Sequence, residues 1–360
     1  MKNSSLHKVV TKTLSLIVPS YNMEAYLPIC LESLIIDDSV QFSKLEVIVV
    51  NDGSRDKTST IAHDFALRYP DVFKVIDKPN GNYGSCINAA LPKTTGRFVK
   101  ILDADDSFDR GRFLELMRFL DDADESIDVV ITPFVQVDQF GAIVKEIRYE
   151  CPINQMFGRE EFNKKLCWVY MHSVAYRTGL LRKIAYMQTE GISYTDTEWV
   201  FRPIAAAKKF IYVDFLVYRY LVGREGQTVS KEATVRSFGS YMKLLEAMSF
   251  KYAEMAHSGE DWNYVSLSTS MRRIALLIYT IEILDLNLGD VVREFDKTDL
   301  LIRSNCPDLY QGFEESMLSR TFHWRYIRFM RTHRRYRLLY VAMLRFYSVL
   351  TRIRGRLSSL

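Results

Sequence analysis

The sequence predicts an α/β fold in which helices flank a mixed, mostly parallel sheet. Up to about residue 135, short runs rich in Val and Ile alternate with helical patterns of about 10 to 15 residues. Strands and helices that alternate in this way build βαβ units, and βαβ units build parallel sheets. From residue 231 onward the pattern is helical almost throughout, so we expect an α/β domain over 1–230 and a helical C-terminal region over 231–360.

The expected elements follow one another in a regular order. Each strand is a short apolar run bounded by polar or turn-forming residues, and each helix carries apolar residues at helical spacing. The expected strands are 14–18, 47–50, 73–76, 98–102 and 129–132, and the helices between them are 27–36, 56–68, 83–91 and 111–120. Further along, 137–141 is typical of a hairpin turn, 168–177 of a strand or an insertion against the sheet, and 211–220 of a strand.

The composition indicates a folded chain with a large core and an uneven charge distribution. Apolar residues make up 48% and aromatic residues 13% of the 360 residues, which argues against a disordered chain. The net charge is +4, but residues 320–360 contain 11 Arg and no Lys, Asp or Glu. The first 319 residues contain 37 basic and 44 acidic side chains, so an acidic body precedes a cationic C-terminal segment.

The cysteines and the apolar runs restrict the compartment. Five Cys residues without C-x-x-C spacing argue against a disulfide framework or a zinc site, and they fit a reducing cytoplasm. The first apolar run, 14–18, is too short for a signal peptide, and no stretch reaches the roughly 18 uninterrupted apolar residues of a spanning helix. We therefore expect a cytoplasmic protein.

Polar residues follow four of the predicted strands at the point where each strand ends. These segments are Pro19–Asn22, Asn51–Ser54, Lys78–Asn82 and Asp103–Asp106. In parallel α/β sheets, ligands bind beyond the carboxyl ends of the strands, where such segments meet. The sequence therefore predicts one nucleotide site at this edge of the sheet.

The most informative of these segments is Leu102–Asp106, which places three carboxylates directly after an apolar strand. Carboxylate oxygens are the ligands that Mg²⁺ and Mn²⁺ prefer, and such sites keep open positions for substrate phosphates. We expect Asp103 and Asp105 to supply the metal and ribose contacts, while Asp106 caps or orients the loop. A solvated acidic turn is the alternative for an isolated Asp-x-Asp.

Candidates for contacts with a nucleobase lie at the ends of the first two strands. The ring of Tyr21 could stack on a base, with Pro19 setting the backbone approach, or it could pack on the neighbouring helix. Asp52 could accept an N–H from the edge of the base, although Asp-Gly-Ser is also an ordinary turn and helix cap. Glu24, near the start of the next helix, could complement the helix dipole.

Two further segments complete the predicted site. Gly81, Gly84 and Asn88 lie in a Gly/Asn-rich loop whose backbone N–H groups could approach an anionic diphosphate. Asp196 is our candidate for the general base, because a carboxylate near the donor could take a proton from an attacking hydroxyl. Glu198 is the second choice, and a solvated acidic turn before a helix is the alternative for this acidic pair.

The motifs together resemble the nucleotide-sugar-binding half of family 2 glycosyltransferases, which have the GT-A fold. The residues that carry the resemblance are Leu16–Asn22, Val49–Ser54, Asn80–Asn88 and Leu102–Asp106. The resemblance is dense over roughly residues 12 to 130 and continues more thinly to about 230. It implies an inverting transferase that uses a nucleotide-diphospho-sugar, most often UDP-linked, together with Mg²⁺ or Mn²⁺.

The resemblance also implies a role for each matched residue. Tyr21 would stack on the base, and Asp52 would bind its edge. Asp103 would lie by the ribose and the metal, and Asp105 would ligate the metal. The acceptor-side motif of the family is usually Glu-Asp; it reads Thr195-Asp196 here and keeps the aspartate, which is the base in the family.

The chain departs from the family pattern in two places. The family loop often ends in Ala-Arg-Asn, but it reads Cys86–Asn88 here, so an expected cation is absent and Lys78 or Lys100 is the candidate to replace it. The run Gly223–Thr228 resembles the closing part of this domain in bacterial polysaccharide enzymes. Arg224 and Gln227 are therefore candidates to reach the diphosphate, with a plain surface loop as the alternative.

The cationic C-terminal segment has helical spacing. One stripe contains Arg328, Arg331, Arg335, Arg345, Arg352 and Arg356, and another contains Tyr336, Tyr340, Met343, Tyr347 and Leu350. Arg heads beside an apolar face suit a helix that lies in an anionic membrane interface. Core packing, a contact in a homo-oligomer and nucleic-acid binding are the alternatives, but no folded nucleic-acid module accompanies the segment. We expect peripheral association with the inner face of the cell membrane and no nucleic-acid partner.

The sequence thus predicts transfer of a sugar from a nucleotide-sugar to a hydroxyl of a glycan, expected to be lipid-linked and bacterial. A sugar-phosphate nucleotidyltransferase is one alternative, but it would normally show a Gly-rich loop bearing Arg or Lys after the first strand, unlike Pro19–Asn22. A non-catalytic membrane-associated scaffold with a relic site is the other. The presence of Asp103, Asp105 and Asp196 argues against it.

Overall fold

The structure is a computed structural model that describes residues 11–166, 168–223, 235–315 and 325–357. The chain divides into two compact units, Met1–Gly226 and Gln227–Leu360.

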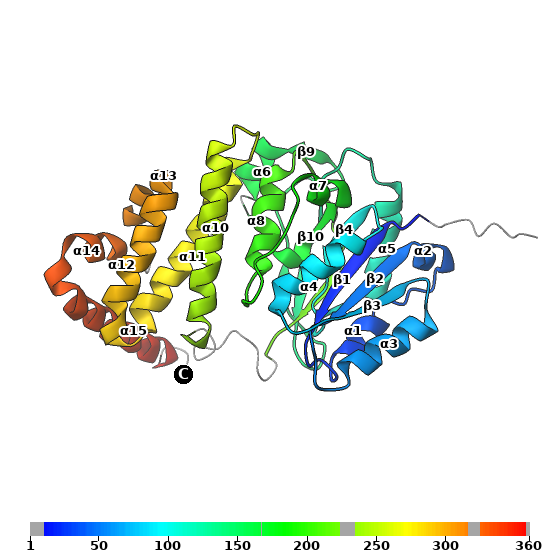
Figure 1. The fold of residues 1–360 in the computed structure, drawn as a ribbon, viewed down its shortest axis with the longest axis horizontal. Coiled ribbons are helices and arrows are strands. Elements are labelled where there is room, and N and C mark those ends of the chain that lie inside the picture. The colour runs from blue at the N-terminus through cyan, green and yellow to red at the C-terminus, as the bar shows by residue number, and fades with distance from the viewer. Residues whose placement is uncertain (1–10, 167, 224–234, 316–324, 358–360) are drawn as a thin grey trace, which may run out of the picture. The chain divides into compact units, whose positions relative to one another are not determined.

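The first unit is built around a sheet of eight strands (Figure 1). In spatial order the strands are β3 (Phe73–Asp77), β2 (Leu45–Asn51), β1 (Leu14–Ser20), β4 (Phe98–Ile101), β10 (Val174–Arg177), β6 (Val129–Ile131), β11 (Lys209–Tyr212) and β9 (Met156–Gly158). The first four are parallel to one another, and β11 is parallel to β6. Strand β10 is antiparallel to both of its neighbours, and β9 is antiparallel to β11. The predicted mixed, mostly parallel sheet is confirmed.

Helices cover both faces of this sheet, and the strands alternate between two cores. Leu16 and Val18 of β1 belong to one core, whereas Ile17 between them belongs to the other. The first core is completed by α1 (Leu27–Glu32), α2 (Ser39–Ser43), α3 (Thr58–Arg68) and α5 (Arg110–Asp122). The second core is completed by α4 (Asn82–Ala90), α6 (Arg159–Lys165), α7 (Thr178–Lys183) and α8 (Asp196–Ala206).

The first unit also contains a second sheet of four strands, and this sheet shows that the single strand predicted over 211–220 is two strands. Its strands are β5 (Ser107–Phe108), β12 (Tyr218–Leu221), β7 (Phe134–Val137) and β8 (Ile143–Ile147). The hairpin turn predicted at 137–141 is confirmed, because it joins the antiparallel strands β7 and β8. The single strand predicted over 211–220 is wrong: β11 ends at Tyr212, the chain leaves the first sheet at Val213–Val217, and β12 joins the second sheet. This crossing brings β12 against β5, directly after the acidic loop.

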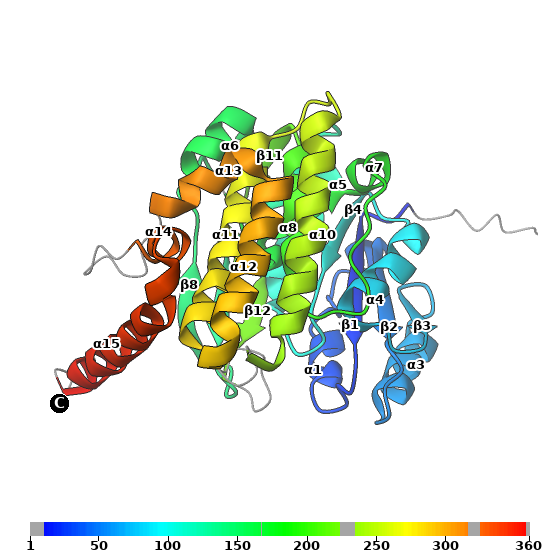
Figure 2. The same ribbon diagram turned by 60° about the vertical axis from the view of Figure 1, so that its left-hand side comes forward.

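The second unit is helical, as predicted. Its helices are α10 (Phe238–His257), α11 (Tyr264–Leu284), α12 (Leu288–Asn305), α13 (Pro307–Tyr310), α14 (Tyr326–Thr332) and α15 (Arg337–Leu357). The three long helices α10, α11 and α12 lie side by side, and α15 packs on α11 and α12 (Figure 2). Among the helices that the structure describes, none combines the length and the apolar character needed to cross a membrane.

Candidate functional site

The carboxyl ends of β1, β2 and β4 meet at one edge of the first sheet. Ser20 at the end of β1 pairs with Asn51 at the end of β2, so Tyr21 and Asp52 follow at matched positions. On the other side of β1, Ile17 pairs with Ile101, which places Asp103 just beyond this edge. The structure therefore brings the predicted base-binding and acidic segments to the same place.

Side chains join the loops that follow β1 and β2. The N–H of Asn22 donates to Ser54 Oγ (3.0 Å), and Asn22 Oδ1 accepts from the N–H of Arg55 (2.9 Å). Glu24 Oε2 accepts from the N–H of Lys57 (3.0 Å), directly before α3. Glu24 is expected to complement the dipole of the helix that follows it, α1, but its contact is with the start of α3. Tyr21 remains exposed at the tip of this loop pair, while Pro19 is buried within β1.

Asp52 is buried and forms an ion pair with Lys78. The Lys78 ammonium donates to Asp52 Oδ1 (2.6 Å) and to Ser85 Oγ (2.8 Å), and the N–H of Gly81 donates to the same carboxylate oxygen (2.9 Å). This network fixes the loop that enters α4. The contacts commit Lys78 to Asp52, so the prediction that Lys78 replaces a diphosphate-binding cation is not supported.

Gly84 and Asn88 hold the segment at 188–190. A Cβ at Gly84 would lie 2.2 Å from the carbonyl oxygen of Thr189, so only glycine permits this close approach. Asn88 Nδ2 donates to the carbonyl of Gln188 (2.9 Å) and to Glu190 Oε1 (2.8 Å). Asn88 Oδ1 accepts from the N–H of Gln188 (2.9 Å). Both residues therefore position the segment that leads to α8, and the approach of the loop N–H groups to a diphosphate stays a prediction.

Asp196 is the first residue of α8, and the residue is exposed. Crowding by surrounding protein atoms removes much of its hydration and raises the pKa of Asp196 to about 6, against the opposing effect of backbone N–H donors. Glu198 is buried, and its two oxygens accept from the N–H (2.7 Å) and the hydroxyl (3.0 Å) of Thr189. Of the two predicted bases, Asp196 has the accessibility and the pKa for proton transfer, whereas Glu198 anchors the adjacent segment.

Tyrosine hydroxyls organise the acidic loop. The Tyr83 hydroxyl donates to Asp103 Oδ1 (2.7 Å), and the N–H of Asp103 donates to the Tyr218 hydroxyl (3.2 Å). Tyr218 in turn donates to Asp106 Oδ2 (2.6 Å), and Asp106 Oδ1 accepts from the N–H of Leu221 (2.8 Å). Burial and the other loop carboxylates raise the pKa of Asp106 well above its usual range. Asp106 therefore ties the loop to β12, in agreement with the expectation that it orients the loop.

Asp103, Asp106 and His172 form a group whose potential ligand atoms all lie within 4.8 Å of one another. The His172 ring packs against Tyr220 and Tyr218, with centroid distances of 4.6 and 4.9 Å. Burial, and then the charge of nearby Lys100, lowers the pKa of His172 to about 3, which keeps the imidazole neutral.

This donor set fits a divalent cation. A neutral imidazole and a carboxylate are both metal ligands, and His172 Nδ1 is buried without a hydrogen-bond partner among the residues that the structure describes. Asp105 is not part of this group, and its assignment as a ligand stays a prediction. The sequence analysis missed His172, because a single histidine 69 residues beyond Asp103 shows no ligand spacing.

Lys100 holds the backbone of His172. Its ammonium is buried and donates to the backbone carbonyls of His172 (2.5 Å) and Val174 (3.3 Å), and burial lowers the pKa of Lys100 to about 7. The structure thus contradicts the prediction that Lys100 replaces a diphosphate-binding cation, because its donors are engaged with this backbone. The other two candidates, Arg224 and Gln227, lie outside the described residues.

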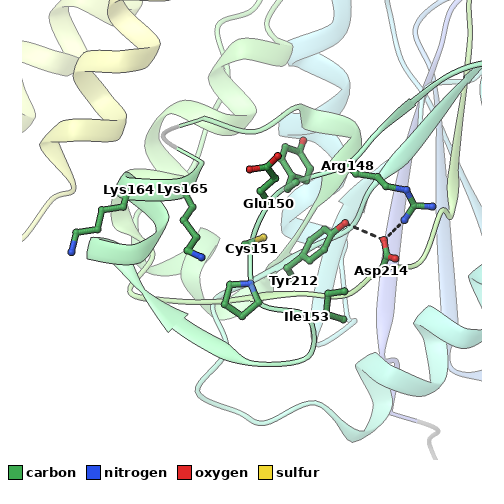
Figure 3. Close-up of a pocket in the computed structure, with 10 residues that line it drawn as sticks. Arg148, Glu150, Cys151, Ile153, Lys164, Lys165, Tyr212 and Asp214 are labelled. Atoms are coloured by element: carbon green, nitrogen blue, oxygen red, sulfur yellow. Dashed lines mark hydrogen bonds and ion pairs between the residues drawn. The ribbon is translucent and has the colours of Figure 1, made fainter.

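A pocket of about 700 Å³ opens beside the end of β11 (Figure 3). Tyr212, the last residue of β11, pairs with the last residue of β6. Tyr176 of β10 pairs with both Val129 of β6 and Val99 of β4, so β6 and β4 run in the same direction and end at the same edge of the sheet. The pocket therefore lies at the same edge as the acidic loop that follows β4. Tyr149 in its wall shares a hydrogen bond with Ser173 Oγ (2.8 Å), next to His172. Its lining residues include Arg148, Tyr149, Glu150, Ile153, Lys165, Tyr212 and Asp214.

The sheet topology and the residues at its carboxyl edge define the GT-A class of glycosyltransferases, as the sequence predicts. Residues 15–186 match the family model described as Glycosyl transferase family 2. This part of the chain therefore belongs to glycosyltransferase family 2, and the predicted transferase class is confirmed.

Relatives and solved structures agree with this assignment. The minor teichoic acid biosynthesis protein GgaB of Bacillus subtilis is 37% identical over 119 residues, which are 33% of this chain and 13% of GgaB. The poly(ribitol-phosphate) beta-N-acetylglucosaminyltransferase TarS of Staphylococcus aureus is 25% identical over 249 residues, which are 69% of this chain and 42% of TarS. The matched segments thus span less than half of either relative.

The fold is also similar to a crystal structure of S. aureus TarS 1–349 in complex with UDP-GlcNAc. The TM-score is 0.66 at 18% identity, and the match covers 94% of this chain and 92% of that one. The similarity covers the helical unit as well as the α/β unit, and it confirms the predicted GT-A fold with a helical C-terminal region.

Proposed function

We propose that this protein transfers a sugar from a nucleotide-diphospho-sugar, with UDP as the nucleotide, to a hydroxyl of a glycan in cell-surface polysaccharide synthesis. The observation that carries the proposal is Asp196, an exposed residue at the start of α8 whose carboxylate has a pKa of about 6. Its charge also acts on Tyr83, which binds Asp103 of the acidic loop. A candidate base and a candidate donor site are therefore neighbours.

The donor would lie across the ends of β1, β2 and β4. Tyr21, exposed after β1, would stack on the base. Asp52 would accept a hydrogen bond from the edge of the base, and its ion pair with Lys78 orients the carboxylate. Asp103, held by the Tyr83 hydroxyl, would bind the ribose.

Asp196 would act as the general base. An attacking acceptor hydroxyl would lose its proton to the Asp196 carboxylate as its oxygen bonds to the anomeric carbon. On the opposite side, the bond between this carbon and the diphosphate oxygen breaks, and the nucleoside diphosphate leaves. The anomeric centre is then inverted. A pKa near 6 suits this role, because the group is ionised at neutral pH and still basic enough to accept a proton.

Mg²⁺ or Mn²⁺ would be held by Asp103, with His172 from the group described above and Asp105 as further candidates. When bound, the cation would supply positive charge to the departing diphosphate. Tyr83 and Lys100 would act through the ligands: Tyr83 orients the Asp103 carboxylate, and Lys100 holds the backbone of His172.

The acceptor would approach from the side of β11. The pocket of Figure 3 combines Tyr149 and Tyr212 with the ion pair between Arg148 and Asp214, a combination that suits a saccharide. The names of the relatives, which refer to teichoic acid and poly(ribitol-phosphate), favour a cell-wall or lipid-linked glycan as the acceptor. For such an acceptor we propose a cytoplasmic enzyme that associates peripherally with the inner face of the membrane, either as a monomer or as a homo-oligomer.

The proposal is tested with a panel of nucleotide-sugars in the presence of Mn²⁺, by nucleotide release with and without glycan acceptors. We expect one UDP-sugar to be turned over, with release stimulated by an acceptor and abolished by EDTA. Asp196→Asn should lose transfer but keep UDP binding, whereas the exposed helix residue Asp64→Asn serves as the matched control. If no donor is bound and none is turned over, the proposed function is refuted.

A further inference from the structure

Helix α15 has apolar side chains on two opposite sides. Val341 and Leu344 are buried on the side that packs on α11 and α12. The outer face, which we define as Leu339, Met343 and Phe346, is exposed by 64%, 50% and 69%. Its spacing of four and three residues forms a continuous apolar stripe on one side of the helix. Figure 2 shows α15 at the end of the helical unit, drawn in red.

Arginines anchor the inner side of this segment and set the orientation of the helix. Arg337 is buried and donates to Asp296 Oδ1 of α12 (2.8 Å). Arg345 donates to the carbonyls of Ile283 (2.6 Å) and Leu286 (2.6 Å), at and just after the end of α11. Because both arginines are held by groups of the unit itself, α15 cannot turn its outer face inward without losing these contacts.

The structure thereby changes the predicted arrangement of the C-terminal stripes. Arg331, expected on a cationic stripe, donates through Nε to Asp299 Oδ1 (2.8 Å) and is almost fully covered. Arg331 and Arg345 therefore serve internal packing. The predicted members Leu350, Arg352 and Arg356 lie outside the described side chains.

Cations nevertheless flank the outer face. Arg328, Arg334 and Arg335 are exposed just before α15, and residues 320–360 contain no Asp or Glu. An exposed apolar stripe next to exposed arginines is typical of a helix that lies in a membrane interface. No described helix can cross a membrane, so this helix would lie flat.

We propose that the outer face of α15 binds an anionic lipid bilayer. Leu339, Met343 and Phe346 enter the boundary of the acyl chains, and Arg334 and Arg335 contact lipid phosphates. Charge complementarity selects the bilayer over a second copy of this chain: a twofold contact between identical faces would bring together two arginine-rich segments that contain no acid. This surface would provide the peripheral membrane association given under the proposed function. Lipid binding itself does not require transferase activity; only its biological purpose rests on the proposed function.

The test compares full-length protein with Leu339→Ser/Met343→Ser/Phe346→Ser in co-sedimentation with vesicles. We expect the wild type to bind phosphatidylcholine vesicles that contain phosphatidylglycerol, with weaker binding at high salt. The triple variant should bind at least about tenfold more weakly, because three apolar side chains no longer enter the lipid. Leu67→Ser, at a site on α3 that is 79% exposed, is the matched control and should bind like the wild type.

Three results would overturn the inference. The first is that the triple variant binds vesicles as well as the wild type does. The second is that the wild type binds equally to vesicles with and without phosphatidylglycerol. The third is that the wild type forms a dimer, which the triple variant does not form, and binds no vesicles. Circular dichroism verifies that the variant is folded. Transfer to a soluble acceptor should be unchanged in the variant, so a failed membrane surface is distinguished from a failed transferase.

Discussion

The raised pKa of Asp196 leads to a specific prediction for the pH dependence of transfer. The carboxylate must be ionised to accept a proton, and it becomes protonated as the pH falls through about 6. About half of the enzyme would carry the basic form at pH 6 and roughly a tenth at pH 5, so kcat/KM should rise about tenfold from pH 5 to pH 7 and then level off. With the ordinary value of 3.8, the same range would be nearly flat.

Substitution separates this residue from other titrating groups. Asp196→Asn keeps the size of the side chain but removes the base, and we expect kcat to fall by about 10² to 10⁴ and the inflection near pH 6 to disappear. Nucleotide release, measured across pH with saturating acceptor and a constant concentration of free Mn²⁺, gives the profile. The Asp64→Asn control should retain the wild-type curve.

Two results would refute the reasoning. A wild-type profile that stays flat down to pH 5 would show that crowding does not raise the pKa of Asp196 or that its protonation does not limit the reaction. An Asp196→Asn variant that retains both rate and inflection would show that another group is the base. Unchanged UDP binding by the variant, measured by calorimetry, would exclude a misfolded donor site as the cause of lost activity.

Three further predictions concern other parts of the structure. Glu282 is buried, and burial raises its pKa to about 8 from the ordinary 4.5, so the folded state holds the proton up to a higher pH than the unfolded state does. The free energy of unfolding should therefore fall by roughly 1.4 kcal/mol per pH unit as the pH rises from about 5 to 8. Urea unfolding should show this slope in the wild type but not in Glu282→Gln. Gly84→Ala would place a Cβ against the Thr189 carbonyl, and we expect a loss of about 1 to 3 kcal/mol in unfolding free energy together with lower kcat, because the segment before α8 must move. Tyr83→Phe removes the hydrogen bond to Asp103, and the Mn²⁺ concentration for half-maximal activity should rise about tenfold or more, without a comparable change in melting temperature; an unchanged Mn²⁺ requirement would contradict a ligand-orienting role for Tyr83.

Contacts with residues that are distant in the sequence hold the loop that enters α4, and the sequence interpretation did not include them. Gly84 and Asn88 are expected near a diphosphate because a Gly/Asn-rich loop enters a helix there, and Lys78 because the cation of the family loop is absent. Each contacts a specific protein group: a backbone segment 100 residues away for Asn88, and the Asp52 carboxylate for Lys78. A loop composition indicates that backbone groups are available, but it does not reveal which protein atoms already occupy them.

The sequence by itself determined the α/β topology and the edge at which the site lies. Alternating strands and helices require parallel pairing, and parallel strands present their carboxyl ends, with Tyr21, Asp52 and Asp103, at one edge. Only the tertiary structure decided how the acidic loop is supported. Tyr218 reaches Asp106 from 112 residues further along, and Lys100 binds the backbone of His172 72 residues away; no local sequence pattern encodes these contacts. Loss of hydration, likewise a property of the folded chain alone, then raises the pKa of Asp196 and keeps His172 neutral, so the folded structure tunes the chemistry of residues whose types the sequence already displays.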